Sequence, residues 1–273
     1  MRAYDMTAKL QDLRRLSWSE SGFTSGTGGT FLKASEGQGT GRVYYKLSAY
    51  DPYRGVFGHE CVNEIVASRL MSLLGVDHLR YQLVHAEVVV DGREFETWVC
   101  RSKSYRKSSE RKQALDAYFR RNAMPGESPL EMCDRLGWGT RIRQMMLVDF
   151  LIANRDRHGA NVEVIRGYDG SERLAPLFDN GVSLLFSTYG DGRRIASFDV
   201  LEDVGANNFV GTRSLEENLR FLAGRDLEVN PVEETWKEPL LAGLDLAAPE
   251  DLLEAVWDMV WRRWNRFALL RDR

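Results

Sequence analysis

Hydrophobic and polar positions along the N-terminal part of the chain predict strands arranged in hairpins. Short runs rich in Val, Tyr, Phe and Thr alternate with polar residues and are separated by Gly-rich turns, which is typical of strands. Asp91 and Gly92 separate two such runs by two residues, a strong signal for a tight hairpin. We therefore expect a sheet of four or more strands. The strand-like runs are residues 30–34, 42–48, 81–90 and 94–100.

Helical periodicity appears twice in the same part of the chain. Residues 57–74 place apolar side chains on one face, and Gly75 follows as a stop signal. Residues 4–16 carry Leu10, Leu13 and Leu16 among charged residues, which predicts a short amphipathic helix.

The C-terminal part of the chain has a mainly helical pattern. Ser128, Pro129 and Glu131 form the signature of a helix start. A long apolar helix is expected to continue through residues 142–153. The aromatic residues near the C-terminus recur at a spacing typical of core packing. The remaining helices are expected at residues 214–223, 232–243 and 249–271.

A polar loop interrupts this pattern between the long helix and a second hairpin. Residues 154–161 read Asn-Arg-Asp-Arg-His-Gly-Ala-Asn, and Asp179 follows the apolar residues 174–178. Three polar side chains, those of Asp156, Asn161 and Asp179, thus each stand beside an apolar run. The turn of the hairpin is expected at residues 168–170.

The spacing of these three residues has a chemical use. Phosphoryl transfer needs a carboxylate to orient and deprotonate the attacking hydroxyl, and oxygen ligands to hold Mg²⁺ against the nucleotide phosphates. Protein kinases take these groups from an Arg-Asp pair, an Asn five residues later and the Asp of a following turn. We therefore expect Asp156 to be the catalytic base, and Asn161 and Asp179 to bind the metal. The alternative is a purely structural loop, because Asp and Asn are common turn formers.

Candidate nucleotide contacts lie in the N-terminal part. A loop rich in Gly, Ser and Thr precedes the first strand pair, and such loops let backbone N–H groups approach phosphate oxygens. Lys46 on the following strand is the expected contact for the α- and β-phosphates, with Lys33 as the second candidate. A flexible loop and an outward-facing lysine are the alternatives. The loop residues assigned to the nucleotide are Ser25, Gly26, Thr27, Gly28 and Gly29.

Two further positions complete the expected nucleotide site. Glu64, preferred to Glu60 because of its apolar neighbours, is expected to pair with Lys46; a solvated helix acid is the alternative. Residues 98–102, which include Cys100, are expected to form the hinge where adenine binds.

Three further features are expected to have structural rather than catalytic roles. His158 is expected to orient the loop by hydrogen bonds, with a direct catalytic role as the alternative. Asp149 interrupts an apolar run, where a carboxylate is costly unless paired, so we expect it to bind loop backbone and fix Asp156. Residues 103–127 are basic and then loop-like, which is typical of a solvated helix face; a docking surface for an acidic partner is the alternative.

Residues 182–212 occupy the place of an activation segment or a substrate platform. The hydroxyls of this stretch are candidate phosphorylation sites, and the sequence gives no basis for choosing among them. They are Ser183, Ser187, Thr188 and Ser197.

Composition sets limits on the class of protein. The 273 residues are 43% hydrophobic and 28% charged, which suits one large domain or two lobes around a real core. The net charge of −3 gives no support for direct binding to nucleic acid. No apolar run reaches the length of a membrane span, and the N-terminus has no secretory pattern. Cys61, Cys100 and Cys133 are odd in number and widely spaced, so we expect reduced thiols in a cytoplasmic protein.

Residues 154–161, together with Pro176, Leu177, Phe178 and Asp179, resemble the HipA-like branch of the kinase fold. In that branch an Asn-x-Asp-x-His-x-x-Asn loop is followed by Pro-Leu-Tyr/Phe-Asp. The Asp-Arg-His-x-x-Asn part of the loop also resembles phosphatidylinositol kinases. The resemblance to HipA-like proteins covers most of the chain, but the chain is shorter than full HipA toxins, and Phe-Asp-Asn-Gly replaces Asp-Phe-Gly.

The resemblance implies an ATP- and Mg²⁺-dependent kinase that phosphorylates protein Ser or Thr hydroxyls, including its own. It implies a protein substrate and a regulatory or antitoxin-like partner. The expected fold is α+β and two-lobed. Residues 1–102 would form an N-lobe with a small antiparallel sheet, and residues 103–273 a mainly helical C-lobe. A phosphatidylinositol-type lipid kinase, a nucleotide-binding pseudokinase and a non-enzymatic regulatory partner are the alternatives.

Overall fold

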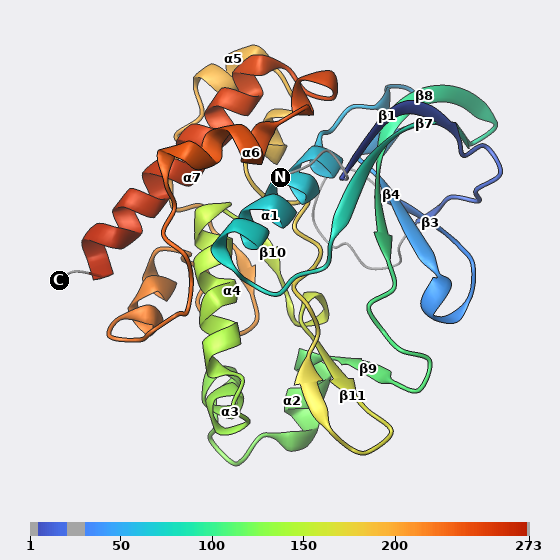
Figure 1. Ribbon diagram of the computed structural model, residues 1–273. Helices are drawn as coiled ribbons and strands as arrows, with labels where there is room; N and C mark the ends of the chain where they lie inside the picture. The colour runs from blue at the N-terminus through green and yellow to red at the C-terminus, as the bar shows by residue number, and fades with distance from the viewer. Residues whose placement is uncertain (1–4, 21–30, 272–273) are drawn as a thin grey trace.

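The computed structural model describes residues 5–20 and 31–271. A six-stranded sheet and one helix, α1, form one side of the molecule, and the remaining helices form the other (Figure 1). This arrangement confirms the predicted α+β class. The strands follow the order β1-β7-β8-β4-β3-β2. Their bounds are β1 Met6–Asp12, β2 Ser19–Glu20, β3 Leu32–Glu36, β4 Val43–Leu47, β7 Tyr81–Val90 and β8 Arg93–Lys103.

The β7–β8 hairpin is the centre of the sheet, and its prediction from the sequence is confirmed. Antiparallel pairing runs from Tyr81 opposite Ser102 to Val90 opposite Arg93. Asp91 has φ 51° at the turn and Gly92 has φ 74°, as the favoured two-residue hairpin turn requires. A small separate hairpin, β5 (Tyr50–Asp51) and β6 (Gly55–Val56), connects β4 to α1.

The N-terminal segment was expected to be a helix, and that prediction is wrong. Met6–Asp12 is strand β1, which pairs in parallel with β7, so the sheet is mixed rather than wholly antiparallel. Leu10 is 42% exposed, whereas Leu13 and Leu16 are buried in the loop that follows the strand. The three-residue spacing of these leucines therefore reflects a strand followed by a turn. The partner strand lies far away in the sequence, where local periodicity carries no information about it.

Helix α1 (Glu60–Leu74) lies between the sheet and the helical side, as Figure 1 shows. Its side chains are buried on almost every face, which identifies a central helix rather than a surface one. It ends at Gly75, whose φ of 81° allows its N–H to reach the carbonyls of Met71 and Ser72. The predicted helix and its stop are confirmed.

The helical side consists of α2 to α7 and several short 3₁₀ turns. The predicted start at Ser128 is confirmed by a complete capping box with Glu131. The chain then turns at Gly137, with φ 76°, so that two helices, α3 and α4, precede the polar loop. The bounds are α2 Leu115–Asn122, α3 Pro129–Arg135, α4 Gly139–Leu151, α5 Gly192–Ala196, α6 Lys237–Leu241 and α7 Glu250–Arg271.

The 3₁₀ turns account for parts of the predicted helices. The helix expected at residues 214–223 is the 3₁₀ turn η4, and the one expected at 232–243 is η5 followed by α6. The bounds are η1 Gly39–Gly41, η2 Gly159–Asn161, η3 Phe186–Thr188, η4 Glu217–Leu222, η5 Glu234–Trp236 and η6 Leu244–Leu246.

A three-stranded sheet, with order β12-β11-β9, lies beside the polar loop. The hairpin of β11 (Glu163–Arg166) and β12 (Glu172–Leu174) was predicted and is confirmed. Strand β9 (Arg111–Ala114) was not predicted, because the basic residues around it obscure the apolar pattern. Helix α2, with Arg120 and Arg121 exposed in its last turn, agrees with the solvated helix face expected within residues 103–127. A short parallel pair joins β10 (Asp156–Arg157) to β13 (Asn207–Asn208).

One large core joins α1, α4 and α7, and a smaller one lies on the sheet. Arg263 of α7 is 1% exposed and donates to the carbonyls of Phe150 and Val200, which fixes the last helix against the end of α4. All three cysteines are buried and free, as expected. Within residues 5–20 and 31–271, none of the helices is long and apolar enough to span a bilayer.

Candidate active site

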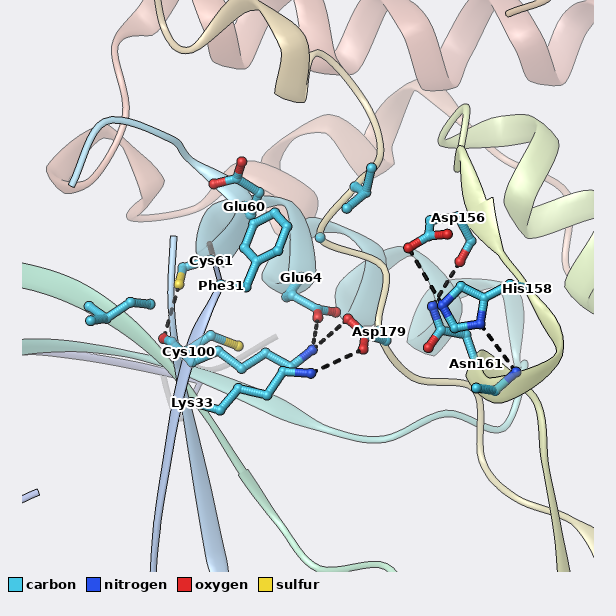
Figure 2. Close-up of a pocket in the computed structure, with 15 residues that line it drawn as sticks. Phe31, Lys33, Glu60, Cys61, Glu64, Cys100, Asp156, His158, Asn161 and Asp179 are labelled. Atoms are coloured by element: carbon cyan, nitrogen blue, oxygen red, sulfur yellow. Dashed lines mark hydrogen bonds and ion pairs between the residues drawn. The ribbon is translucent and has the colours of Figure 1, made fainter. Parts of the chain in front are cut away.

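A cavity of about 280 Å³ lies between the sheet and the helical side. Side chains from β4, α1, β8, the polar loop and the turn after β12 line it, and Figure 2 shows them converging on one space. The predicted site residues that the structure describes all belong to this lining. They are Lys46, Glu64, Cys100, Asp156, Asn161 and Asp179.

The phosphate-loop prediction concerns a segment that lies outside the described residues. Its role stays a prediction. The residues are Ser25, Gly26, Thr27, Gly28 and Gly29.

The side chain of Lys46 joins two carboxylates at the centre of the cavity. Its Nζ lies 2.7 Å from Glu64 Oε1 and 2.7 Å from Asp179 Oδ1. The pairing of Lys46 with Glu64 rather than Glu60 agrees with the prediction. Lys33, the second candidate, also approaches the site, with its Nζ 3.7 Å from Asp179 Oδ2 (Figure 2). Two lysines therefore share one carboxylate.

The charges of this cluster stabilise one another. Burial by itself would lower the pKa of Lys46, but the Asp179 and Glu64 carboxylates outweigh it and raise that pKa well above its usual value. Burial would likewise raise the pKa of Asp179, but Lys46 and Lys33 hold it below its usual range. The carboxylate of Asp179 is therefore ionised, as a metal ligand must be.

The turn that carries Asp179 is fixed by neighbours on the sheet side. Asp179 has φ 58°, a left-handed conformation that is uncommon outside glycine but tolerated by Asp. Its N–H donates to the hydroxyl of Tyr81 at 3.2 Å, and the next N–H, of Asn180, donates to Glu64 Oε2 at 2.9 Å. Asn63 Nδ2 binds the carbonyl of Gly181 at 3.0 Å. Helix α1 thus positions both the lysine partner and the turn.

Asp156 lies across the cavity from the lysines, beside His158 and Asn161 (Figure 2). Its carboxylate has only weak contacts, at 3.5 Å from Asn207 Nδ2 and 3.7 Å from His158 Nε2. His158 Nδ1 accepts the N–H of Ala160 at 3.2 Å, so the histidine caps the turn that follows, in agreement with the expected orienting role. A half-buried carboxylate with free hydrogen-bonding capacity is suited to accept a proton from a bound hydroxyl.

Asn161 is anchored to the backbone of Asp156. Its Nδ2 donates to the Asp156 carbonyl at 2.8 Å, and its Oδ1 has no hydrogen-bond partner within the described chain. That oxygen and the Asp179 carboxylate are hard ligands of the kind Mg²⁺ prefers. No group of three or more His, Cys, Asp and Glu side chains is placed to bind a metal in the described ranges. A Mg²⁺ ion here would complete its shell with water and phosphate oxygens, as it commonly does.

Arg157 is the organising residue that sequence reasoning missed. It is 0% exposed, and its guanidinium pairs with Asp149, also 0% exposed, at 2.8 Å. It donates to the Phe178 carbonyl at 2.9 Å and to Asn180 Oδ1 at 2.6 Å. One buried side chain therefore ties the loop of Asp156 to the turn of Asp179.

Asp149 was expected to bind loop backbone, and its actual partners are side chains. Besides Arg157, it accepts from Asn154 Nδ2 at 2.9 Å, and Asn154 Oδ1 in turn accepts the N–H of Asp156 at 3.2 Å. The sequence did offer a signal for the pair of Asp149 and Arg157, because an isolated acid in an apolar run needs a partner and the neighbouring loop contains this arginine.

The segment predicted to be the hinge lies within a strand, and its role in binding adenine stays a prediction. Residues 98–102 belong to β8, which continues to Lys103. Cys100 lies in the middle of the sheet, opposite Lys46 on β4 and Leu83 on β7, where it forms part of the cavity wall. Burial raises the pKa of its thiol well above the usual value. Sequence reasoning also missed several lining residues: Phe31, Leu47, Cys61, Ala160, Gly181 and Val182.

The candidate phosphorylation sites differ in access. Ser183 is 0% exposed and Thr188 is 2% exposed, and both donate to backbone carbonyls nearby. Ser187 is half-buried and Ser197 is exposed. Of the four hydroxyls, Ser197 is therefore the most accessible.

Comparison with known proteins supports the fold. No protein-family model matches the sequence, and no curated protein matches it. The structure is similar to the Helicobacter pylori proinflammatory kinase CtkA, with a TM-score of 0.61 and 16% identity over 88% of this chain and 93% of that chain. HipA of the Shewanella oneidensis toxin–antitoxin system, solved with HipB and operator DNA, matches with a TM-score of 0.45 and 15% identity over 85% of this chain and 60% of that one. The similarity to CtkA shows a kinase-like fold, as the sequence predicted, and activity has to be inferred from the cavity.

Proposed function

We propose that this chain is an ATP- and Mg²⁺-dependent phosphotransferase that moves the γ-phosphoryl group to a Ser or Thr hydroxyl of a protein. The observation that carries the proposal is the convergence of Asp156, Asn161 and Asp179 in one cavity with a lysine already paired to Glu64. Each of these groups matches one requirement of phosphoryl transfer, and they come from segments far apart in the sequence.

The two sides of the cavity would have different tasks. Asp156 would orient the acceptor hydroxyl and take its proton, since its carboxylate has no close cationic partner. Asn161, which lies beside Asp156, and Asp179, which lies on the side of the lysines, would together hold Mg²⁺, which neutralises charge on the phosphates. Lys46 and Lys33, which now share Asp179, would then be available to phosphate oxygens while Glu64 keeps Lys46 in place. Catalysis would come from positioning and charge stabilisation.

Transfer from γ-labelled ATP tests the proposal. The purified protein is incubated with labelled ATP and Mg²⁺, alone and with a cell lysate, and protein and lipid fractions are then separated. We expect label in protein, recovered as phosphoserine or phosphothreonine after acid hydrolysis, and its loss when EDTA removes the metal. Label in the lipid fraction alone would support the phosphatidylinositol-type alternative, and absence of any transfer would support the pseudokinase.

Lys46→Met should raise the KM for ATP by about 10- to 100-fold, because a hydrogen bond to a charged group is worth about 1.5–3 kcal/mol. Steady-state kinetics with varied ATP measures this, and a thermal melt checks that the variant is folded. Lys103→Met, at the exposed end of the adjacent strand β8, is a matched control outside the cavity lining. An unchanged KM in Lys46→Met would remove this lysine from the nucleotide site.

A further inference from the structure

A second cavity, of about 800 Å³, lies between β9, α2 and the β11–β12 hairpin. Figure 1 places β9, α2 and β11 side by side, below the main sheet. We call this cavity the basic pocket, because five of its lining side chains are cationic: Arg106, Arg111, Lys112, Arg121 and Arg166.

The charge of this region differs from that of the whole chain. Residues 103–121 contain seven basic and two acidic residues, although the chain has a net charge of −3. The remaining sequence is therefore distinctly acidic. Such local concentration of one sign creates a field that attracts ligands of the opposite sign.

Two of the arginines have no partner within the described chain. Arg111 and Arg121 are exposed, and neither side chain makes a hydrogen bond or an ion pair with a described residue. Arg111 also lies directly opposite Arg166 in the β9–β11 pairing. Like charges directly opposite each other on neighbouring strands destabilise a sheet. An anionic ligand between them would relieve this repulsion.

The two acids that line the pocket offset only part of this charge. Glu110 pairs with Arg173 at 3.1 Å and accepts the N–H of Lys107 at 2.8 Å. Glu172 accepts the hydroxyl of Tyr118 at 2.5 Å, and its Oε1 lies 3.9 Å from Nε of Arg166, so it offsets part of the charge of that cation. The pocket therefore keeps an excess of positive charge.

The basic pocket and the active site share strand β11. This strand begins two residues after Asn161, and Val164, three residues after Asn161, already lines the basic pocket. In an extended chain this separation is roughly 10 Å. The N–H of Leu115 at the start of α2 donates to the Val162 carbonyl at 2.8 Å, which fixes the pocket to the catalytic loop. The linings of the two cavities are thus about three residues apart along β11.

We propose that the basic pocket docks an acidic segment of the protein substrate, a few residues from the hydroxyl that is phosphorylated. This inference rests on the proposed function and assigns the substrate class of the same site. A peptide suits the pocket better than a nucleic acid does. The excess positive charge is confined to one pocket while the remaining sequence is acidic, whereas a nucleic acid backbone is bound along a groove of continuous positive charge.

Binding without ATP tests the docking site independently of catalysis. Two fluorescent peptides share one serine-containing core, and one carries a run of Glu where the other carries Gln. We expect the wild-type protein to bind the Glu peptide about tenfold more tightly by fluorescence anisotropy at low salt, and the preference to weaken as salt rises. The double variant Arg111→Glu/Arg121→Glu should lose the preference.

The control is Lys9→Glu/Arg193→Glu, which makes the same change in net charge at exposed positions on β1 and α5. It should keep the preference. Equal binding of the two peptides by the wild type, or equal loss in the control, overturns the docking proposal. Tighter binding of a single-stranded oligonucleotide of matched charge, abolished by the double variant, would assign the pocket to nucleic acid instead and also overturn it.

Phosphorylation of the same peptides separates this inference from the proposed function. We expect kcat/KM for the Glu peptide to exceed that for the Gln peptide by about tenfold, with the difference lost in the double variant. Selective binding of the Glu peptide without transfer would support the docking site and contradict the kinase activity. Equal transfer to both peptides would support the kinase activity and contradict the docking site.

Discussion

Asp156→Asn is expected to lower the rate of phosphoryl transfer by about 10²–10⁴-fold, the usual contribution of a general base. The variant keeps the shape of the side chain but removes the carboxylate that would accept the proton of the acceptor hydroxyl. Folding should be unaffected, because that carboxylate makes only the two weak contacts at 3.5 and 3.7 Å. Nucleotide binding should also persist, since the lysines and Asp179 lie on the other side of the cavity, and Asn161 is bound to the backbone carbonyl of Asp156, which the substitution keeps.

Single-turnover transfer from γ-labelled ATP, together with a melting curve, measures both parts of this prediction. Asp245→Asn is the matched control, because Asp245 is exposed in η6 and lies outside the cavity lining. A variant at Asp156 that transfers phosphate at the wild-type rate would exclude this residue as the base.

Arg157→Met should lower the free energy of unfolding by about 3–5 kcal/mol, which is the usual result of removing one member of a buried ion pair. The reason is that Asp149 would be left charged at 0% exposure, with Asn154 as its remaining side-chain partner. This loss is a large fraction of the roughly 5–15 kcal/mol that stabilises an ordinary domain. Denaturant unfolding measures it, and Arg213→Met, at an exposed position, should change stability little.

A second variant separates stability from positioning. Asp149→Leu combined with Arg157→Met removes the unpaired charge, so part of the stability should return. Activity should stay low, because the Phe178 carbonyl and Asn180 would still lack the guanidinium that joins the two loops. Recovery of activity along with stability would show that Arg157 serves the core alone.

Local signals in the sequence predicted the elements whose partners are close in the chain. The Asp91–Gly92 turn, the Ser128 capping box and the Gly75 stop each depend on a few adjacent residues, and each appears as expected. The β11–β12 hairpin belongs to the same class. The apolar neighbours of Glu64 were also sufficient to select it over Glu60 as the partner of Lys46.

Distant pairings were not predicted, because no local pattern encodes them. Strand β1 pairs with β7, which lies about 70 residues further along the chain. Strand β9 pairs with β11 across three helices, α2, α3 and α4, and the polar loop. The end of β8 was placed too early, since it depends on the pairing of this strand with β4 through Lys103.

Only one member of the buried ion pair, Asp149, was predicted from the sequence. The sequence predicted that Asp149 is buried and paired, because it is an acid in an apolar run. It did not predict that Arg157 is buried, because this residue belongs to a polar loop. Its burial follows from the fold around it, because the loop packs beneath the turn of Asp179 and brings Asn180 within 2.6 Å. The sequence alone therefore identified the residues proposed for catalysis and metal binding better than it identified Arg157, which positions them.

The central claim is that Asp179 binds a metal ion that holds the nucleotide. Isothermal titration of a non-hydrolysable ATP analogue, with Mg²⁺ and then with EDTA, tests it most directly in the wild type, Asp156→Asn and Asp179→Asn. We predict Mg²⁺-enhanced binding in the first two proteins and loss of the enhancement in Asp179→Asn. Equal enhancement by Mg²⁺ in Asp179→Asn, or none in the wild type, would contradict the account.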